Sequence, residues 1–331
     1  MDKIPIYKLQ SNYKSTVYNS GKWTNGSKTK ELEEKLKEYL NVKYVILTNS
    51  GTSALLATYW VLKNEYDTLF VDPYTFPATY QPARLLGYKI NFIKTILADK
   101  ISLPKTGLNV ITHLFGQPNR SLSKINNISF IEDACQSFGA EFNGKKLGTF
   151  GKLGCFSFYP TKMLHTCGHG GAVVTNQENY YKGLKIFIES GRFEGKMTEE
   201  IALNLRMDEL KAEFLLYELD NYESKINKQR EIAKEFLRLV PLPQPFLEET
   251  SGERHIYSTF NLCLKNRDKF RKYMDNLGIE TLVYYGDDVL PVTERSKYKE
   301  LTSTIVAVPC RWNLTVREIA RIKGALKGWF I

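Results

Sequence analysis

The first half of the chain alternates between short apolar runs rich in β-branched residues and longer helical patterns, and this alternation restricts the possible folds most strongly. Short buried strands separated by helices are typical of a mostly parallel sheet with helical crossovers. The expected strands lie at 42–47, 68–72, 89–93, 109–112, 128–131, 155–158 and 171–174, and the expected helices at 28–40, 54–62 and 78–86. The sequence therefore predicts an α/β fold.

From about residue 207 the pattern changes to long helical periodicity, which a proline-rich break at 241–245 ends. The elements expected in this half are helices at 208–220, 223–239, 267–277 and 317–330 and strands at 258–264 and 281–285. A chain of 331 residues favours about two domains. We expect a large domain over residues 1–225 and a small C-terminal α/β domain over 226–331.

Charge and composition exclude several classes of protein. The net charge is +10, but the lysines are interleaved with acids, as in 28–39, which indicates a solvated helix and not a nucleic-acid surface. The sequence contains no bilayer-spanning apolar stretch and no signal-peptide pattern. Five cysteines without paired spacing favour a reducing compartment, and four histidines lack metal-ligand spacing. We therefore expect a cytoplasmic protein that binds neither nucleic acid, membrane nor metal.

Lys162 is the first candidate for chemistry, because it lies between an apolar strand and the glycine-rich run 168–171. A desolvated amine loses its proton more easily and becomes a nucleophile toward a carbonyl. Asp133 ends another apolar strand, although an acid there could also be a helix cap. A lysine that forms a Schiff base, together with an acid for the pyridinium nitrogen, is the protein signature of pyridoxal phosphate (PLP) chemistry.

Two loops are further candidates for ligand binding. The turn 49–54 joins a strand to a helix and carries a glycine and hydroxyl side chains, so it predicts either an anion site or a simple N-cap. The segment 72–79 follows a strand at the edge where α/β sheets bind ligands. Phe76 in this segment could stack on a flat ring or belong to the core.

Taken together, the motifs identify a resemblance that extends from about residue 19 to 322. The chain resembles the DegT/DnrJ/EryC1/StrS sugar aminotransferases, which are PLP enzymes of fold type I. The matching runs are Ser20-Gly-Lys-Trp-Thr-Asn-Gly26, Asn49-Ser-Gly-Thr-Ser-Ala-Leu55, Thr75-Phe-Pro-Ala-Thr79, His113-Leu-Phe-Gly-Gln-Pro118, Glu132-Asp-Ala-Cys-Gln-Ser-Phe-Gly-Ala140, Gly144-Lys-Lys-Leu-Gly-Thr-Phe-Gly151, Ser157-Phe-Tyr-Pro-Thr-Lys162, Asn204-Leu-Arg-Met-Asp-Glu-Leu-Lys-Ala212 and His255-Ile-Tyr-Ser-Thr-Phe260.

The resemblance implies a role for each matched residue. Lys162 would bind PLP covalently and then act as general base and acid, and Asp133 would pair the ring nitrogen. Gln136 would lie near the ring hydroxyl, and Asn204 would act from the partner subunit of a homodimer with a shared active site. The implied cofactor-binding residues are Gly51, Thr52, Ser53, Phe76, Asp133, Gln136, Ser157, Lys162 and Asn204. The residues expected to face the substrate are Tyr159, His169, Arg206, His255 and Tyr285.

The resemblance also implies the reaction, which is transfer of an amino group from L-glutamate to a nucleotide-linked 3- or 4-keto-6-deoxysugar in surface-glycan (O-antigen) or deoxysugar biosynthesis. Two departures concern residues that face the substrate. His169 replaces the usual acid after the lysine, and the histidine usually found downstream of Tyr285 is missing. The alternatives are a PLP enzyme that acts on another keto acceptor and a non-catalytic regulator that binds PLP or a sugar.

Overall fold

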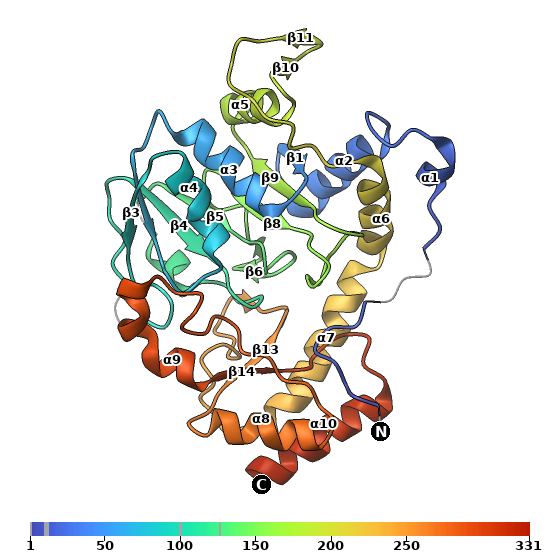
Figure 1. Ribbon diagram of the computed structural model, residues 1–331, viewed down its shortest axis with the longest axis vertical. Coiled ribbons are helices and arrows are strands. Elements are labelled where there is room, and N and C mark those ends of the chain that lie inside the picture. Colours follow the sequence, from blue (N-terminus) through green and yellow to red (C-terminus); the bar gives the residue numbers. More distant parts are fainter. Residues whose placement is uncertain (1, 10–12, 99–100, 126) are drawn as a thin grey trace.

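The computed structural model describes residues 2–9, 13–98, 101–125 and 127–331 (Figure 1). Its centre is a seven-stranded sheet with the order β1-β9-β8-β5-β4-β2-β3. The strands are β1 (Tyr44–Thr48), β2 (Thr68–Val71), β3 (Lys89–Phe92), β4 (Leu108–Thr112), β5 (Phe130–Asp133), β8 (Gly154–Ser157) and β9 (Gly171–Thr175). The pairs from β3 through β8 are parallel, and β9 is antiparallel to both of its neighbours. The prediction of a mostly parallel α/β sheet is therefore confirmed.

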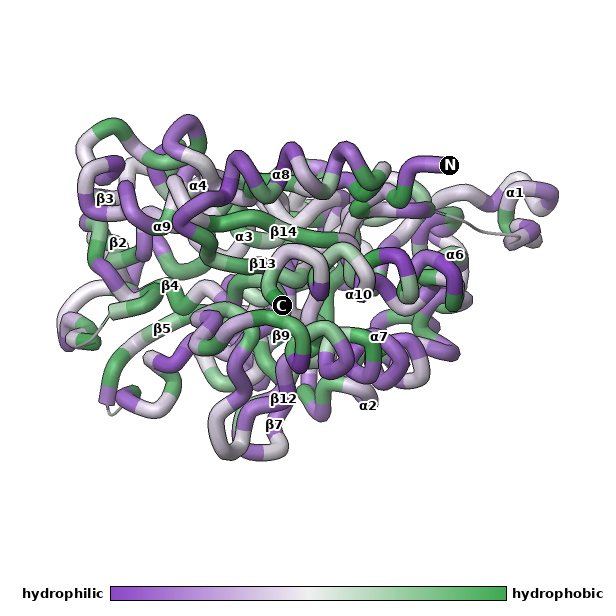
Figure 2. Tube along the Cα trace, turned by 90° about the horizontal axis from the view of Figure 1, so that it is seen from below, coloured by the Kyte–Doolittle hydropathy of each residue, from purple (hydrophilic) through white to green (hydrophobic). Residues whose placement is uncertain are grey.

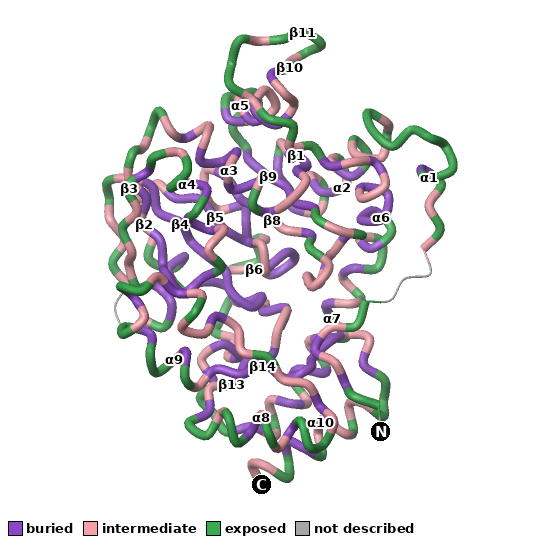
Figure 3. Tube along the Cα trace, viewed as in Figure 1, coloured by how far each residue is buried: buried purple, intermediate pink, exposed green. Residues whose placement is uncertain are grey.

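Successive side chains of a strand point to opposite faces of the sheet. Because the strands are apolar on both sides, helices cover both faces. In β1, Val45 and Leu47 pack into one apolar cluster with helices α2 (Lys28–Leu40) and α6 (Glu209–Asp220). Ile46 packs into the other cluster, with α3 (Gly51–Leu62) and α5 (Glu178–Ile188). The strands between these layers are largely buried (Figure 3).

The C-terminal part of the chain has an apolar cluster of its own. Helix α7 (Tyr222–Leu237) runs from the large sheet toward a two-stranded sheet of β13 (Phe260–Cys263) and β14 (Ile305–Val308), with α8 (Arg267–Asn276) and α10 (Val316–Phe330) nearby (Figure 1). The exposed side of α8 is hydrophilic in Figure 2, whereas Phe270 and Met274 are buried. Ile4 joins this cluster, and its backbone pairs with the segment around Ile279.

The remaining elements are short. They are α1 (Thr16–Ser20), α4 (Gln81–Leu85), α9 (Lys299–Thr304), the 3-10 helices η1 (Pro77–Thr79), η2 (Arg120–Lys124) and η3 (Val292–Tyr298), and the strands β6 (Glu141–Phe142), β7 (Lys145–Lys146), β10 (Arg192–Phe193), β11 (Lys196–Met197) and β12 (Glu253–Arg254). Among the described residues, no helix is both long and apolar enough to cross a bilayer.

One expected strand is wrong. Residues 281–285 form a single bridge, between Leu282 and Ala307, and no regular strand. Tyr285 has φ of +55°, which lies outside the extended region and ends any strand at this point. Helix α5 and strand β14 were not expected from the sequence.

Candidate active site

A cavity of about 580 Å³ lies at the carboxyl ends of β4 and β5, beside the N-terminus of α3. This is the edge at which parallel α/β sheets bind ligands. The sheet brings together residues from distant parts of the sequence. The predicted site residues that line the cavity are Gly51, Thr52, Phe76, Asp133, Gln136, Ser157, Tyr159, Lys162, His169 and Tyr285.

Asp133 is the last residue of β5, and its carboxylate is held by two hydrogen bonds. Thr79 Oγ1 donates to Asp133 Oδ2 at 2.7 Å, and the Cys135 backbone N–H donates to Oδ1 at 3.1 Å. Asp133 is 5% exposed, so these donors compensate for the loss of water around the charge. The carboxylate is therefore fixed at the floor of the cavity.

Lys162 lies in a tight turn after β8, in which its backbone N–H donates to Tyr159 O at 2.8 Å. Burial lowers the pKa of its amine, while Cys135 and Asp133 partly oppose this effect. A lowered pKa favours the neutral amine, which is the nucleophilic form. Lys162 and Asp133 are thus a reactive amine and a fixed acid within one cavity.

The start of α3 forms an anion-binding cradle. Ser50 is the N-cap, and its Oγ accepts from the Ser53 backbone N–H at 3.1 Å. In the described part of the chain, the backbone N–H groups of Gly51 and Thr52 have no partner, and both residues line the cavity. A Cβ at Gly51 would lie 2.7 Å from Ser157 Cβ, so only glycine permits this close approach. Helix N-termini of this kind bind phosphate groups.

The remaining cavity residues form its walls and mouth. Phe76, in the loop after β2, is 59% exposed and offers an aromatic face. The Tyr159 and His169 rings contact each other at the rim, with a centroid distance of 5.2 Å. Gln136 Nε2 donates to Tyr285 Oη, which joins two residues 149 positions apart in the chain.

Four of the predicted site residues, Ser53, Asn204, Arg206 and His255, do not line the cavity. Ser53 Oγ donates to Asn49 Oδ1 at 2.6 Å, so its hydroxyl serves the turn itself. Arg206 and Asn204 contact each other on the surface, with Arg206 Nε donating to Asn204 Oδ1 at 3.1 Å. His255 is fully buried.

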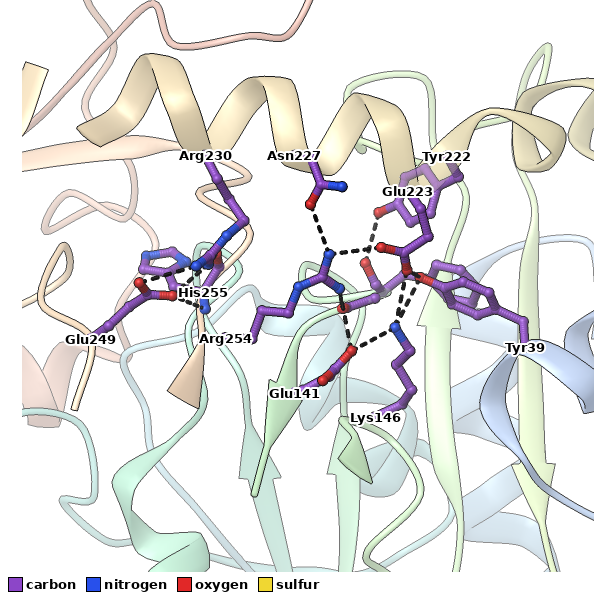
Figure 4. Close-up of polar contacts among 12 residues, drawn as sticks. Tyr39, Glu141, Lys146, Tyr222, Glu223, Asn227, Arg230, Glu249, Arg254 and His255 are labelled. Carbon is purple, nitrogen blue, oxygen red and sulfur yellow. Dashed lines mark hydrogen bonds and ion pairs between the residues drawn. The ribbon is translucent and has the colours of Figure 1, made fainter. Parts of the chain in front are cut away.

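The contacts of His255 are structural. Its Nε2 lies 3.0 Å from Phe246 O, and its Nδ1 accepts from the Tyr257 backbone N–H at 2.9 Å. Figure 4 shows its backbone carbonyl beside Arg230, whose guanidinium also pairs with Glu249. Both ring nitrogens are therefore engaged within the protein, away from the cavity.

Thr79, Thr112 and Tyr284 also line the cavity, although they were not predicted as site residues from the sequence. Thr79 is in the matched run at 75–79, but its contact with Asp133 depends on the fold. The Thr112 and Tyr284 side chains line the cavity, and their hydroxyl oxygens are buried without a hydrogen-bond partner in the described ranges. Such atoms gain a partner when a polar ligand enters.

The residues of the cavity fit pyridoxal phosphate. Lys162 supplies an amine for its aldehyde, Asp133 an acid for its ring nitrogen, and Phe76 an aromatic face. The cradle at the start of α3, together with the Ser157 hydroxyl at the end of β8, supplies donors for its phosphate. Among the residues that the structure describes, no group of three or more His, Cys, Asp or Glu side chains is placed to hold a metal ion.

Comparisons with known proteins agree with this assignment. The sequence model of the DegT/DnrJ/EryC1/StrS aminotransferase family matches residues 6–327. A UDP-2-acetamido-2-deoxy-3-oxo-D-glucuronate aminotransferase of Pseudomonas aeruginosa is 29% identical over 81% of this chain and 79% of its own length. A dTDP-3-amino-3,4,6-trideoxy-alpha-D-glucose transaminase of Streptomyces venezuelae is 24% identical over 99% of this chain and 96% of its own length. The crystal structure of a DegT DnrJ EryC1 StrS aminotransferase from Brucella abortus superposes with a TM-score of 0.81 at 26% identity, covering 95% of this chain and 93% of that one.

Proposed function

Because this chain belongs to the DegT/DnrJ/EryC1/StrS family of PLP-dependent aminotransferases, we propose that it transfers an amino group from L-glutamate to a nucleotide-linked keto-deoxysugar. The proposal rests above all on one observation, which is that Lys162, Asp133 and the cradle at the start of α3 line the same cavity. The similar aminotransferases from Pseudomonas aeruginosa and Streptomyces venezuelae are named for sugar nucleotides, which supports this class of acceptor.

Bound PLP supplies an electron sink that makes the α-proton of an amino acid acidic. Asp133, held by Thr79 and Cys135, would keep a proton on the ring nitrogen of the cofactor. Lys162 Nζ would hold the cofactor. Once an amino donor has freed it, the same amine would move a proton from the donor's α-carbon to the cofactor carbon that it had held, acting first as base and then as acid. The phosphate cradle and Phe76 would orient the ring beside Lys162.

We also propose that the enzyme is a cytoplasmic homodimer, with the partner subunit's Asn204 completing the site. Asn204 and Arg206 lie at the surface, outside the cavity of their own chain, which is where residues that serve a neighbouring subunit would lie. Arg206 Nη1 also donates to Asn25 Oδ1 at 3.0 Å, so this surface includes part of the run 20–26. Tyr159, His169 and Tyr285 are the candidates of this chain for contacts with the sugar.

The test is an absorbance spectrum of the purified protein with added PLP, before and after excess L-glutamate. We expect a visible Schiff-base band that decreases with glutamate while a pyridoxamine band grows. Lys162→Ala should abolish the visible band, and Lys152→Ala should retain it, because Lys152 instead pairs with Glu65 outside the cavity. A wild-type spectrum in Lys162→Ala would refute the assignment.

The acceptor is then identified by turnover of a panel of keto-sugar nucleotides by the pyridoxamine form. Turnover of a dTDP- or UDP-linked keto sugar would support the proposal, and turnover of only another keto compound would change the acceptor. Borohydride reduction that adds PLP to Lys162, without turnover of any acceptor, would instead favour a non-catalytic regulator.

A further inference from the structure

Tyr285 is buried in the cavity wall in a backbone conformation that bulky residues rarely adopt. It is 9% exposed and has φ of +55°. A non-glycine residue in this region is strained and persists only where its surroundings hold it. Its ring lies on Phe115, with a centroid distance of 6.0 Å and an interplanar angle of 24°. It also meets the edge of Tyr74 at 5.7 Å, so the ring is fixed from two sides.

The hydroxyl group of Tyr285 fixes Gln136 in turn. Gln136 Nε2 donates to Tyr285 Oη, and Gln136 Oε1 accepts from the Phe115 backbone N–H at 2.9 Å. With both ends of the carboxamide engaged, its oxygen and nitrogen cannot exchange places. Among the described residues, the remaining amide N–H of Gln136 and the O–H of Tyr285 have no acceptor.

Both of these donors belong to residues that line the cavity with Lys162 and Asp133. Burial, with a smaller effect from Asp133, raises the pKa of Tyr285, so its phenol keeps its proton in the neutral range. A protonated phenol that already accepts one hydrogen bond can still donate one. The cavity therefore contains two fixed donors side by side on one wall.

We propose that Tyr285 is a positioning residue, which holds Gln136 in one orientation so that the pair presents two donors to an oxygen atom of the bound molecule. This inference rests on the proposed aminotransferase function for its role in the reaction, but the coupling between Tyr285 and Gln136 does not. The oxygen belongs either to the cofactor ring or to the sugar, and the two sources have different kinetic consequences.

The coupling is tested first in the cofactor-free protein. Nuclear magnetic resonance of protein labelled with [15N]glutamine reports the Gln136 carboxamide, which Gln136→Leu identifies. Tyr285→Phe keeps the ring that packs on Phe115 and removes only the hydroxyl, so we expect the Gln136 signals to move and their protons to exchange faster with water. Tyr284→Phe is the matched control, because the neighbouring Tyr284 hydroxyl has no bond to Gln136.

The role in the reaction is tested with the holoenzyme. Loss of one hydrogen bond corresponds to an effect of up to about tenfold. We expect Tyr285→Phe to raise the Kd for PLP by this factor if the oxygen is on the cofactor, or the KM for the keto-sugar nucleotide if it is on the sugar. If the two residues act as a unit, the double variant with Gln136→Leu should lose no more than the larger single loss.

The proposal is overturned if Tyr285→Phe leaves the Gln136 signals unchanged. It is also overturned if those signals move but neither the Kd for PLP nor the KM changes, because Tyr285 would then only support the fold. Failure of the wild-type protein to bind PLP would refute the aminotransferase function instead. The resonance experiment would still decide whether Tyr285 positions Gln136.

Discussion

Replacing Thr79 by valine, which has almost the same volume, should still destabilise the protein, because the Thr79 hydroxyl links two buried groups. Its hydroxyl donates to Asp133 Oδ2 at 2.7 Å and contacts Thr75 Oγ1 at 2.8 Å. Since the Thr79 hydrogen points to the carboxylate, Thr75 must be the donor in the second contact. Thr75 and Thr79 are each 1% exposed, so water cannot replace either bond without rearrangement.

The expected loss can be estimated from these two bonds. A hydrogen bond to a charged group contributes about 1.5–3 kcal/mol, and a buried hydroxyl left without a partner costs about 1–3 kcal/mol. Because neighbouring terms do not add fully, we expect Thr79→Val to lower the free energy of unfolding of the cofactor-free protein by about 2–4 kcal/mol. Affinity for PLP should fall as well, since Asp133 is less firmly held.

Urea unfolding and fluorescence titration with PLP would measure the two effects, with Thr79→Ser as the matched control. Serine keeps the hydroxyl and removes one buried methyl group, at a cost of about 1 kcal/mol. If Thr79→Val destabilises the protein no more than Thr79→Ser, the hydrogen bonds contribute little and the reasoning fails.

Three further predictions concern the cradle, the N-terminal segment and the lysine. Gly51→Ala should weaken PLP binding at least about tenfold in a fluorescence titration, because its Cβ would lie 2.7 Å from Ser157 Cβ. Gly324→Ala, where a Cβ meets nothing within 4 Å, should leave the affinity unchanged, and equal losses would refute the steric argument. Burial raises the pKa of Glu213, but hydrogen bonds from residues 13–17, which include the first turn of α1, outweigh this effect and hold the pKa at about 2. Amide protection factors in α1, which correct for the intrinsic pH dependence of exchange, should therefore be high above pH 4.5 and fall as the pH falls toward 2, and they should already be low at pH 7 in Glu213→Gln. Burial lowers the pKa of Lys162, so the charged amine destabilises the folded, cofactor-free protein at neutral pH. Lys162→Met should therefore be more stable than the wild type at pH 7, and this difference in stability should disappear as the pH rises to about 10.5. Equal stability of the two proteins in urea at pH 7 would contradict this.

Much of the large sheet could be predicted from the sequence, because its strands are buried on both faces and form short apolar runs. The expected helix at 28–40 has the bounds of α2, and the strands that carry Asp133 and Ser157 were located to within a few residues. Strand β14 was missed because its run Ile305–Val308 directly follows a short helix without a turn signal. The proposed division into two domains near residue 225 stays a prediction.

The grouping of site residues could be predicted only where each residue ends a strand or starts a helix, as for Asp133 and Gly51. His255 lies in a matched motif, yet its ring is held by Phe246 O, across a loop of nine positions whose path no periodic pattern reveals. The hydrogen bond between Gln136 and Tyr285 could not be predicted either. It depends on a positive φ at Tyr285, which no residue type in the segment 281–285 indicates. The catalytic and binding roles of these residues stay predictions until they are measured.

The position of Ile4 has a consequence for the order of folding. Its N–H donates to Gly278 O at 2.8 Å, its carbonyl accepts from Glu280 N at 2.9 Å, and its side chain lies in the C-terminal cluster at 1% exposure. Ile4 and its bridge partner Ile279 are 275 positions apart (279 minus 4). Contacts that close such long loops form slowly, because the chain must first lose the entropy of the intervening segment. We therefore expect that, during synthesis on the ribosome, the segment around Ile4 remains unpaired until residues 278–280 have been made, so that an early segment of the chain reaches its native contacts late.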